Sequence, residues 1–338
     1  MSVKILIIRL GAIGDVVHSA IIQLSIKRKH PDTEIHFLSS DTCAPLIKND
    51  PNLSKVRTLD SSRKSDFFYL YTLGMSLRRE NYDVIINLSN SLRNTLLTTL
   101  ARPGRIVSRN RNRIHAVDAF FNSAQEVFHD IEKPEELKLY TSNDAEAFIE
   151  NEIQGYERPF IVINPAGDTD HIRQGRIWSL GYWTELSNKL VEKYGGTIFI
   201  VGSKQEKKYH QELSKINSSV LFSGVLDLEK SAALFAEVDL FISGDSGPLH
   251  MASALGVKTL GLMGSTPTRA CGPYGTKGYA ISPLYKCACE NRKFCTVSQS
   301  FYKPCIQSIT PEVVLDFIDR NNMLSSSRRV DCESAKKV

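Results

Sequence analysis

The sequence alternates between short apolar runs and longer segments with the spacing of amphipathic helices. In the first half the apolar runs cover 3–8, 34–38 and 83–88, and the helical patterns cover 16–27 and 92–100. The second half restarts with apolar runs at 160–164, 197–201, 220–222, 240–243 and 259–263, and with helical patterns at 180–193, 205–216, 228–235 and 248–255. Strands that alternate with helices are typical of parallel sheets covered by helices. The pattern therefore predicts an α/β fold made of doubly wound parallel sheets.

A chain of 338 residues is longer than one hydrophobic core usually supports, so we expect two domains. The polar stretch 151–159 separates a helical pattern from a new strand and marks the boundary. We therefore predict an N-terminal domain over 1–155, a C-terminal domain over 156–324 and a flexible tail over 325–338. Thr310 and Pro311 are expected to begin a closing helix that runs to Met323.

The composition is that of a globular protein with a mildly basic surface. Hydrophobic residues make up 42% of the chain, and 42 Lys and Arg against 37 Asp and Glu give a net charge of +5. This balance suits an anionic substrate or a membrane surface. No apolar run approaches the roughly 20 residues that cross a bilayer, and the run at 3–8 is too short for a signal peptide. We therefore expect a cytoplasmic protein.

The segment Gly244-Asp-Ser-Gly-Pro-Leu-His250 follows an apolar strand and opens a helix. Asp245 or Ser246 can cap that helix, and Pro248 suits its first turn. The helix N-terminus would then present free N–H groups at the carboxyl end of a strand, where α/β proteins bind phosphates. A plain capped helix without a ligand is the alternative interpretation. A second glycine loop, 261–267, follows the next strand, and neither loop has the pattern of a dinucleotide or ATPase site.

A third glycine turn, Arg9-Leu-Gly-Ala-Ile-Gly-Asp15, follows the first strand. A carboxylate at position 15 could act as a general base for a sugar hydroxyl. It could equally cap the first helix, where the helix dipole favours negative charge. His18, one turn further on, is expected to be a packing residue.

These two glycine turns together resemble a known family. The first segment, from Ile8 to Val16, is similar to the N-terminal signature of the ADP-heptose:lipopolysaccharide heptosyltransferases, glycosyltransferase family 9. The second signature is similar to the segment from Gly244 to Gly256. Further segments that match are Gly264 to Pro267, Gly272-Pro-Tyr-Gly275, His115-Ala-Val-Asp118, and Arg176-Ile-Trp178 followed by Trp183. The similarity runs from residue 3 to about 320.

The resemblance implies a GT-B fold, in which two Rossmann-like domains face a central cleft, and an inverting transfer of heptose from ADP-heptose to a lipopolysaccharide inner-core acceptor. It places the catalytic base at Asp15. It places donor contacts at Ser246, Gly247, His250, Arg176 and Glu206, with Asp245 in the same donor loop. Arg176 stands where the family carries a lysine, so it keeps the charge but presents it as a planar fork.

Six arginines and no acidic residue lie between residues 84 and 117. We expect Arg109, Arg111 and Arg113, together with Gly14, to contact an anionic acceptor such as a lipid-linked core. The same basic patch suits peripheral binding at the inner face of the cytoplasmic membrane. A solvated loop is the alternative. A nucleic-acid partner is not expected, because no aromatic residues are interleaved with the arginines and no known binding module is present.

Four cysteines, Cys287, Cys289, Cys295 and Cys305, are clustered before the last helix. Their spacing lacks the close pair usual in structural zinc sites, so packing thiols are favoured over a structural zinc ion. We expect the chemistry itself to need no metal or other cofactor, because the second half has no cluster of acidic ligands.

Two other functions fit parts of the same pattern. A sugar-nucleotide epimerase of the same fold would act on the donor without any acceptor. A non-catalytic protein that binds a nucleotide sugar would bind ADP and show no turnover that depends on Asp15.

Overall fold

The computed structural model describes residues 3–89, 91–109, 114–165, 177–213, 216, 218–283 and 303–325. Its contacts divide the chain into two compact units. Unit 1 comprises Met1–Ser142 and Tyr274–Thr276, and unit 2 comprises the rest. The division falls at Ser142 rather than at residue 155, because the helix that follows it packs on a helix of unit 2.

Unit 1 contains a five-stranded parallel sheet in the order β3-β2-β1-β4-β5. Its strands are β1 (Lys4–Ile8), β2 (Glu34–Ser40), β3 (Lys55–Leu59), β4 (Val84–Asn87) and β5 (Arg105–Ser108). This is the order of a Rossmann-type half. Ile5 to Ile8 of the central strand are completely buried, which explains why β1 reads as a continuous apolar run rather than an alternating one.

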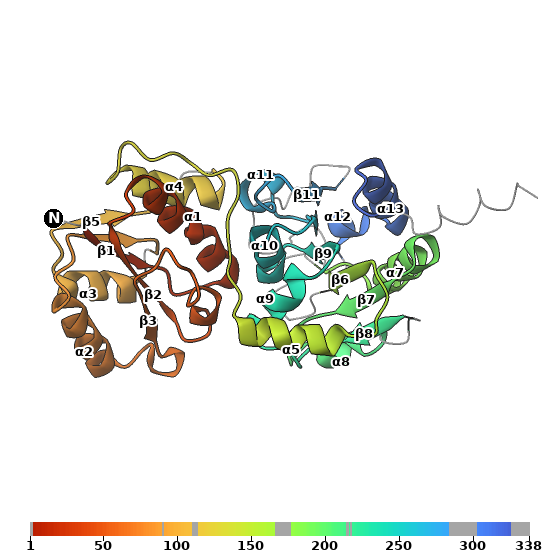
Figure 1. Ribbon diagram of the computed structural model, residues 1–338, viewed down its shortest axis with the longest axis horizontal. Coiled ribbons are helices and arrows are strands. Elements are labelled where there is room, and N and C mark those ends of the chain that lie inside the picture. Colours follow the sequence, from red (N-terminus) through yellow and green to blue (C-terminus); the bar gives the residue numbers. More distant parts are fainter. Residues whose placement is uncertain are drawn as a thin grey trace, which may run out of the picture. The chain divides into compact units, whose positions relative to one another are not determined.

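Two pairs of helices cover the two faces of this sheet (Figure 1). One pair is α1 (Ile13–Lys29) and α4 (Ala116–Gln125), and the other is α2 (Phe67–Arg78) and α3 (Leu92–Ala101). Strand order requires this arrangement, since right-handed crossovers to the left and to the right of β1 lie on opposite faces. Leu70 and Leu77 of α2 and Leu97 of α3 pack on the sheet in one core. The short helices η1 (Ala44–Leu46) and η2 (Ser61–Arg63) complete the unit.

Unit 2 contains a six-stranded parallel sheet in the order β11-β10-β9-β6-β7-β8. Counted from its own first strand, this is the full Rossmann order. The strands are β6 (Phe160–Asn164), β7 (Thr197–Ile200), β8 (Ser219–Leu221), β9 (Leu240–Gly244), β10 (Thr259–Leu262) and β11 (Gly278–Ile281). The predicted fold class of two Rossmann-like parallel-sheet units is thus confirmed.

The helices of unit 2 pack around a core that contains Trp178 and Trp183. Among them, α7 packs on α13, while α9 packs on α5 and α10. Thr310 caps α13, as the sequence predicts. The helices are α5 (Asn143–Ile153), α7 (Leu180–Tyr194), α8 (Lys207–His210), α9 (Leu228–Ala236), α10 (Gly247–Ala254), α11 (Thr268–Cys271), α12 (Pro304–Gln307) and α13 (Pro311–Arg320).

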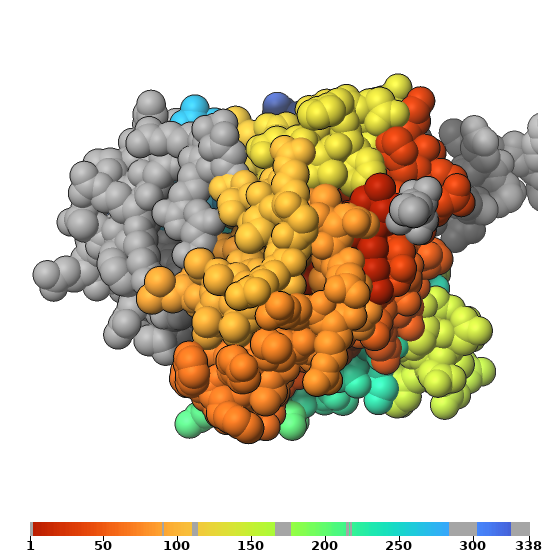
Figure 2. Space-filling view, turned by 90° about the vertical axis from the view of Figure 1, so that its left-hand side faces the viewer, coloured from red at the N-terminus to blue at the C-terminus, as the bar shows by residue number. Residues whose placement is uncertain are grey.

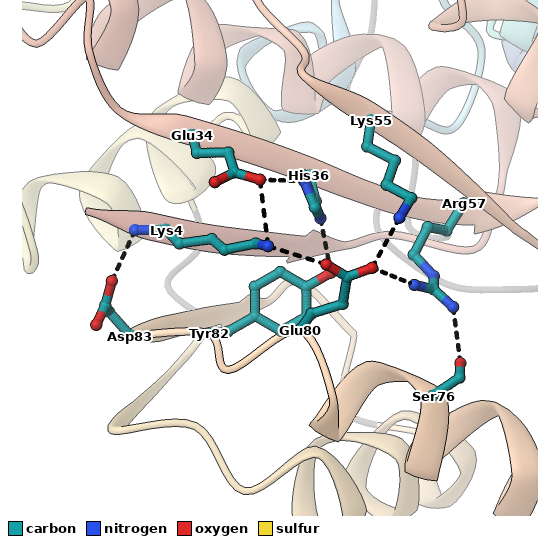
Figure 3. A network of polar contacts seen from close by, with 9 residues as sticks. All are labelled: Lys4, Glu34, His36, Lys55, Arg57, Ser76, Glu80, Tyr82 and Asp83. Atoms are coloured by element: carbon teal, nitrogen blue, oxygen red, sulfur yellow. Dashed lines mark hydrogen bonds and ion pairs between the residues drawn. The ribbon is translucent and has the colours of Figure 1, made fainter. Parts of the chain in front are cut away.

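A network of charged and polar side chains lies at the amino-terminal edge of the sheet in unit 1 (Figure 3). Its centre is Glu80, which accepts hydrogen bonds from Lys4 of β1 at 2.9 Å and from Lys55 and Arg57 of β3 at 2.7 and 2.9 Å. These hydrogen bonds lower the pKa of Glu80 to about 2. The network therefore ties the end of α2 to two strands of the sheet.

Candidate active site

The carboxyl edge of each sheet has one place where neighbouring strands lead into loops on opposite faces. In unit 1 this place lies between β1 and β4, and in unit 2 it lies between β6 and β9. Ligands of doubly wound proteins bind at such points, because the diverging loops leave a crevice between them. The glycine turn with Asp15 follows β1, and the segment with Ser246 follows β9. The two sequence signatures therefore occupy the two switch points.

Asp15 lies inside the first turn of α1 and does not cap it. The N-cap residue is Ala12, which has no side chain that could accept a hydrogen bond. The Asp15 carboxylate is instead paired with Nη2 of Arg9 and is about one-third exposed. The capping interpretation of Asp15 is therefore wrong, because the helix begins three residues earlier than a cap at this position requires. Gly14 is buried in the same turn.

Arg9 holds this carboxylate from a buried position. Its Nη1 donates to the carbonyl of Leu88 at the end of β4, at 2.7 Å, while Nη2 contacts Asp15. Burial lowers the pKa of Arg9, and the charge of Asp15 opposes this effect. The side chain thus spans the switch point of unit 1 and fixes the carboxylate relative to β4. Arg9 belongs to the N-terminal signature from Ile8 to Val16, but no role for its side chain could be predicted from that pattern.

Three arginines follow three neighbouring strands at this edge: Arg9 after β1, Arg93 after β4 and Arg109 after β5. Within the described residues, the Nε atom of each is buried and forms no hydrogen bond. The guanidinium groups of Arg9 and Arg109 lie 5.9 and 4.8 Å from the ring centre of Phe120. Donors held in this way beside a sheet edge suit an anionic ligand. Arg109 is thus placed at the edge that carries Asp15, whereas Arg111 and Arg113 lie outside the described residues.

His18 is buried, as expected for a packing residue. Its ring meets that of His115 edge to face, with centroids 5.3 Å apart. His115 is the N-cap residue of α4, and its Nδ1 accepts from the backbone N–H of Val117 at 3.2 Å. The two histidines therefore fix α4 on α1 behind the Asp15 turn.

The loop between β9 and α10 of unit 2 is held by hydrogen bonds among small polar side chains. Ser243 at the end of β9 bonds both Asn164 at the end of β6 and the hydroxyl of Ser246, at 3.1 and 2.9 Å. Ser246 is the N-cap residue of α10, yet its side chain makes no capping hydrogen bond. Ser246 thus occupies the predicted cap position without a side-chain capping bond, since its hydroxyl is turned toward Asn164. The sequence analysis did not identify Asn164.

The Ser246 hydroxyl therefore leaves the first N–H groups of α10 without a cap from the N-cap side chain. Gly247 is the first residue of the helix. Asp245 and His250 lie next to each other, with Oδ1 and Nε2 3.7 Å apart, and both are buried. A helix N-terminus of this kind binds phosphate oxygens through its backbone.

Glu206 lies in the loop after β7 and is buried. Its Oε2 accepts from the N–H and the hydroxyl of Ser203, at 2.8 and 2.9 Å. The neighbouring His210 bonds Ser223 through Nδ1 at 2.7 Å, and burial lowers its pKa to about 4. The carboxylate of Glu206 thus lies at the carboxyl edge of the sheet that carries Ser246, and its contact with the donor stays a prediction.

The remaining predicted site residues fall largely outside the described part of the chain. Arg176, the cysteines at 287, 289 and 295, and the tail from 326 onward all lie outside the described residues. Cys305 is buried in α12. Among the described residues, no three His, Cys, Asp or Glu side chains are grouped as metal ligands. In the same residues, no helix combines the length and the apolar character that a bilayer-spanning segment needs.

Comparison with known proteins decides the family. The model of glycosyltransferase family 9 (heptosyltransferase) matches residues 70–300, about two-thirds of the chain. The chain belongs to glycosyltransferase family 9. Among curated family members, the lipopolysaccharide core heptosyltransferase OpsX of Haemophilus influenzae is 24% identical over 300 residues, which cover 82% of this chain and 83% of the relative. The lipooligosaccharide heptosyltransferase 2 of the same species is 24% identical and covers 93% of this chain and 97% of the relative.

Solved family 9 structures share the fold. The glycosyl transferase family 9 protein of Veillonella parvula superposes with a TM-score of 0.84 at 16% identity, and covers 95% of this chain and 97% of that one. The ADP-heptose lipopolysaccharide heptosyltransferase II of Escherichia coli gives a TM-score of 0.74 at 20% identity, with 95% and 98% covered. The architecture of this glycosyltransferase is therefore the GT-B fold.

Proposed function

We propose that this family 9 glycosyltransferase transfers heptose from ADP-heptose to a lipid-linked lipopolysaccharide core acceptor, with inversion at the anomeric carbon. The names of its relatives support the donor and the acceptor class. The observation that carries the proposal is the placement of Asp15: its carboxylate stands at the switch point of unit 1, held by Arg9, and caps no helix.

In the proposed reaction, an acceptor hydroxyl attacks the anomeric carbon of the donor while Asp15 takes its proton. The bond between that carbon and the diphosphate oxygen breaks, and ADP leaves with the electron pair. The N–H groups at the start of α10 stabilise the charge that develops on the diphosphate. Ser246, Gly247 and His250 are the proposed donor contacts in this loop, with Arg176 and Glu206 completing the donor site.

Arg93 and Arg109 are proposed to receive the anionic groups of the acceptor at the same edge of unit 1 as Asp15, with Arg111 and Arg113 extending that patch. We further propose that the enzyme works at the inner face of the cytoplasmic membrane, since a lipid-linked acceptor must be met there. Neither step requires a resident cofactor.

The test is Asp15→Asn, which keeps the size and hydrogen-bonding reach of the side chain but removes the base. We expect kcat to fall about 10²–10⁴-fold, the usual contribution of a general base. The affinity for ADP is expected to remain, because the donor loop belongs to unit 2. Turnover is measured as heptose transfer from ADP-heptose to a panel of truncated core acceptors. Calorimetry with ADP measures the donor affinity separately.

Near-normal turnover in Asp15→Asn would remove this residue from the role of base. Donor consumption without any acceptor would instead indicate an epimerase or hydrolase. Binding of ADP with no turnover on any acceptor would indicate a non-catalytic binding protein.

A further inference from the structure

The most exposed apolar side chains of the described residues gather at the beginnings of two helices. Leu92 of α3 is 90% exposed, and Phe68, Phe67 and Tyr71 of α2 are 71, 69 and 43% exposed. Side chains of this size rarely remain in water in such a group unless they meet a partner or a membrane. Figure 2 shows α2 and α3, in orange, at the surface of unit 1.

The first turns of these two helices lie side by side. Both helices return from the carboxyl edge of one parallel sheet, so they run in the same direction. They touch where Gly74 faces Leu100, since a Cβ built on Gly74 would stand 2.7 Å from the Cβ of Leu100. Phe67 lies seven residues before Gly74 and Leu92 eight before Leu100, so each starts about 10–12 Å from this contact. The four side chains therefore form one patch.

Basic residues also lie next to this apolar patch in the sequence. Arg63 and Lys64 directly precede α2, and Arg93 follows Leu92. Arg63 is partly neutralised by Asp66 at 2.8 Å, but Lys64 is exposed beside the two phenylalanines. Aromatic and aliphatic groups ringed by cations are typical of surfaces that bind anionic membranes.

The patch also lies at the functional edge of its unit. Helices that follow parallel strands begin at the carboxyl edge of the sheet, and this is the edge that holds Asp15, Arg93 and Arg109. An acceptor anchored in a bilayer would present its sugar close to such an edge if the same edge touched the bilayer. The exposed Lys64 beside the apolar side chains favours a lipid surface over a protein partner, for which a cation at this place has no particular advantage.

We propose that the first turns of α2 and α3 form a membrane-docking surface, which inserts Phe67, Phe68 and Leu92 among the headgroups of an anionic bilayer. Tyr71 stands at the level of the headgroups, where its hydroxyl remains hydrated. Lys64, which is exposed, pairs with lipid phosphates. This inference rests on the proposed function only in taking the acceptor to be lipid-linked.

The test compares sedimentation of the full-length protein with vesicles of phosphatidylglycerol and phosphatidylcholine and with vesicles of phosphatidylcholine alone. We expect binding to the anionic vesicles, weakened by salt. The affinity of the double variant Phe67→Ser/Phe68→Ser for these vesicles should be lower by about tenfold or more, because the substitutions remove most of the inserted apolar area. Val225→Ser is the matched control, since Val225 is 54% exposed in unit 2 and should be irrelevant to binding.

Equal binding by the double variant and the wild type would overturn the proposal, as would failure of the wild type to bind anionic vesicles. A change from dimer to monomer on substitution, without vesicle binding, would assign the patch to contact between copies instead. The double variant should keep wild-type kcat and KM on an acceptor stripped of its acyl chains, and lose activity on the same acceptor in vesicles. Vesicle binding needs no turnover, so it remains interpretable even if heptose transfer fails in every assay.

Discussion

Arg9 connects the loop after β1 to the end of β4, and its two hydrogen bonds give it a definite task. One arm binds the backbone at Leu88 and the other binds Asp15. A guanidinium that is fixed to the backbone can hold a carboxylate in one orientation, and orientation contributes strongly to the rate of a proton transfer. We therefore assign Arg9 as a positioning residue for the proposed base.

Arg9→Gln should lower kcat by about tenfold or more, because Asp15 then loses both its cation and its fixed orientation. Arg9→Lys should retain part of the rate, since a lysine keeps the charge but cannot bind both partners in the planar fork of an arginine. Steady-state kinetics of both variants, beside ADP binding, checks this expectation. If Arg9→Gln matched the wild type in kcat, the positioning role would be wrong.

At the level of single residues, the sequence pointed to much of the candidate site but not to its supports. Asp15, Ser246 and His250 stand in recognisable signatures, and the structure places each at a switch point. Asn164 carries no such pattern, because it comes to its place through the pairing of strands that are distant in sequence. The orientation of the Ser246 hydroxyl toward Asn164 could not be predicted for the same reason.

Helix α2 packs on α3 through a close approach that depends on a glycine. Gly74 is buried, and an added Cβ would stand 2.7 Å from two side-chain atoms of Leu100. We expect Gly74→Ala to destabilise the protein by about 1–3 kcal/mol, because the two helices must move apart. Thermal unfolding measures the change.

Gly181→Ala is the matched control for Gly74→Ala. Gly181 also lies in a helix, α7, but the nearest atom to its built Cβ is the Ser179 hydroxyl at 3.9 Å, an ordinary contact. There the substitution should be neutral or stabilise by up to about 1 kcal/mol, since alanine favours the helical backbone. Equal losses at both positions would contradict the packing argument.

Glu80 links the end of α2 to β1 and β3, so its charge stabilises a junction between elements. Its folded pKa of about 2 lies below the ordinary 4.5, so the stabilisation is complete above pH 4.5 and is lost as the pH falls toward 2. Glu80→Gln should lower the free energy of unfolding by about 1–3 kcal/mol at neutral pH, with partial exposure reducing the effect. Denaturant unfolding at several pH values should show the difference shrinking in acid, and a constant difference would argue against this origin.

Among the elements, the central strands were predicted almost to the residue, whereas β3, β5 and β11 were missed. All three are edge strands, with charged or half-exposed residues in place of a continuous apolar run. Helix α2 was also missed, because its exposed aromatic residues obscure the usual separation of apolar and polar faces. Helix α8 spans Lys207–His210 and is thus shorter than the helix predicted over 205–216.

On the scale of the whole molecule, each unit contains a buried histidine whose pKa is lowered. Burial lowers the pKa of His36 in unit 1, where the ring contacts Tyr82 and Glu34 at 2.9 and 2.8 Å. Burial likewise lowers the pKa of His210 in unit 2 to about 4. Both histidines are therefore neutral in the folded protein and become protonated more readily on unfolding.

The stability of unit 2 should consequently fall as the pH drops below the ordinary histidine value of 6.5 toward 4, and the lowered pKa of His36 should give unit 1 a decline of the same sign below 6.5. The sign follows from the extra protons that the unfolded chain binds in this range. Calorimetry from neutral to acid pH measures the decline, and His210→Gln should flatten it for unit 2 while leaving unit 1 as it was. An unchanged slope in that variant would show that other groups dominate.

The two ends of the sheet in unit 1 carry opposite kinds of charge arrangement. At the amino-terminal end, Lys4, Lys55 and Arg57 all pair with Glu80. At the other end, the buried Nε atoms of Arg9, Arg93 and Arg109 form no hydrogen bond within the described residues. Substitutions at the amino-terminal end should consequently change mainly the stability of unit 1. Substitutions at the carboxyl end should change mainly the proposed acceptor specificity, so the two properties can vary independently.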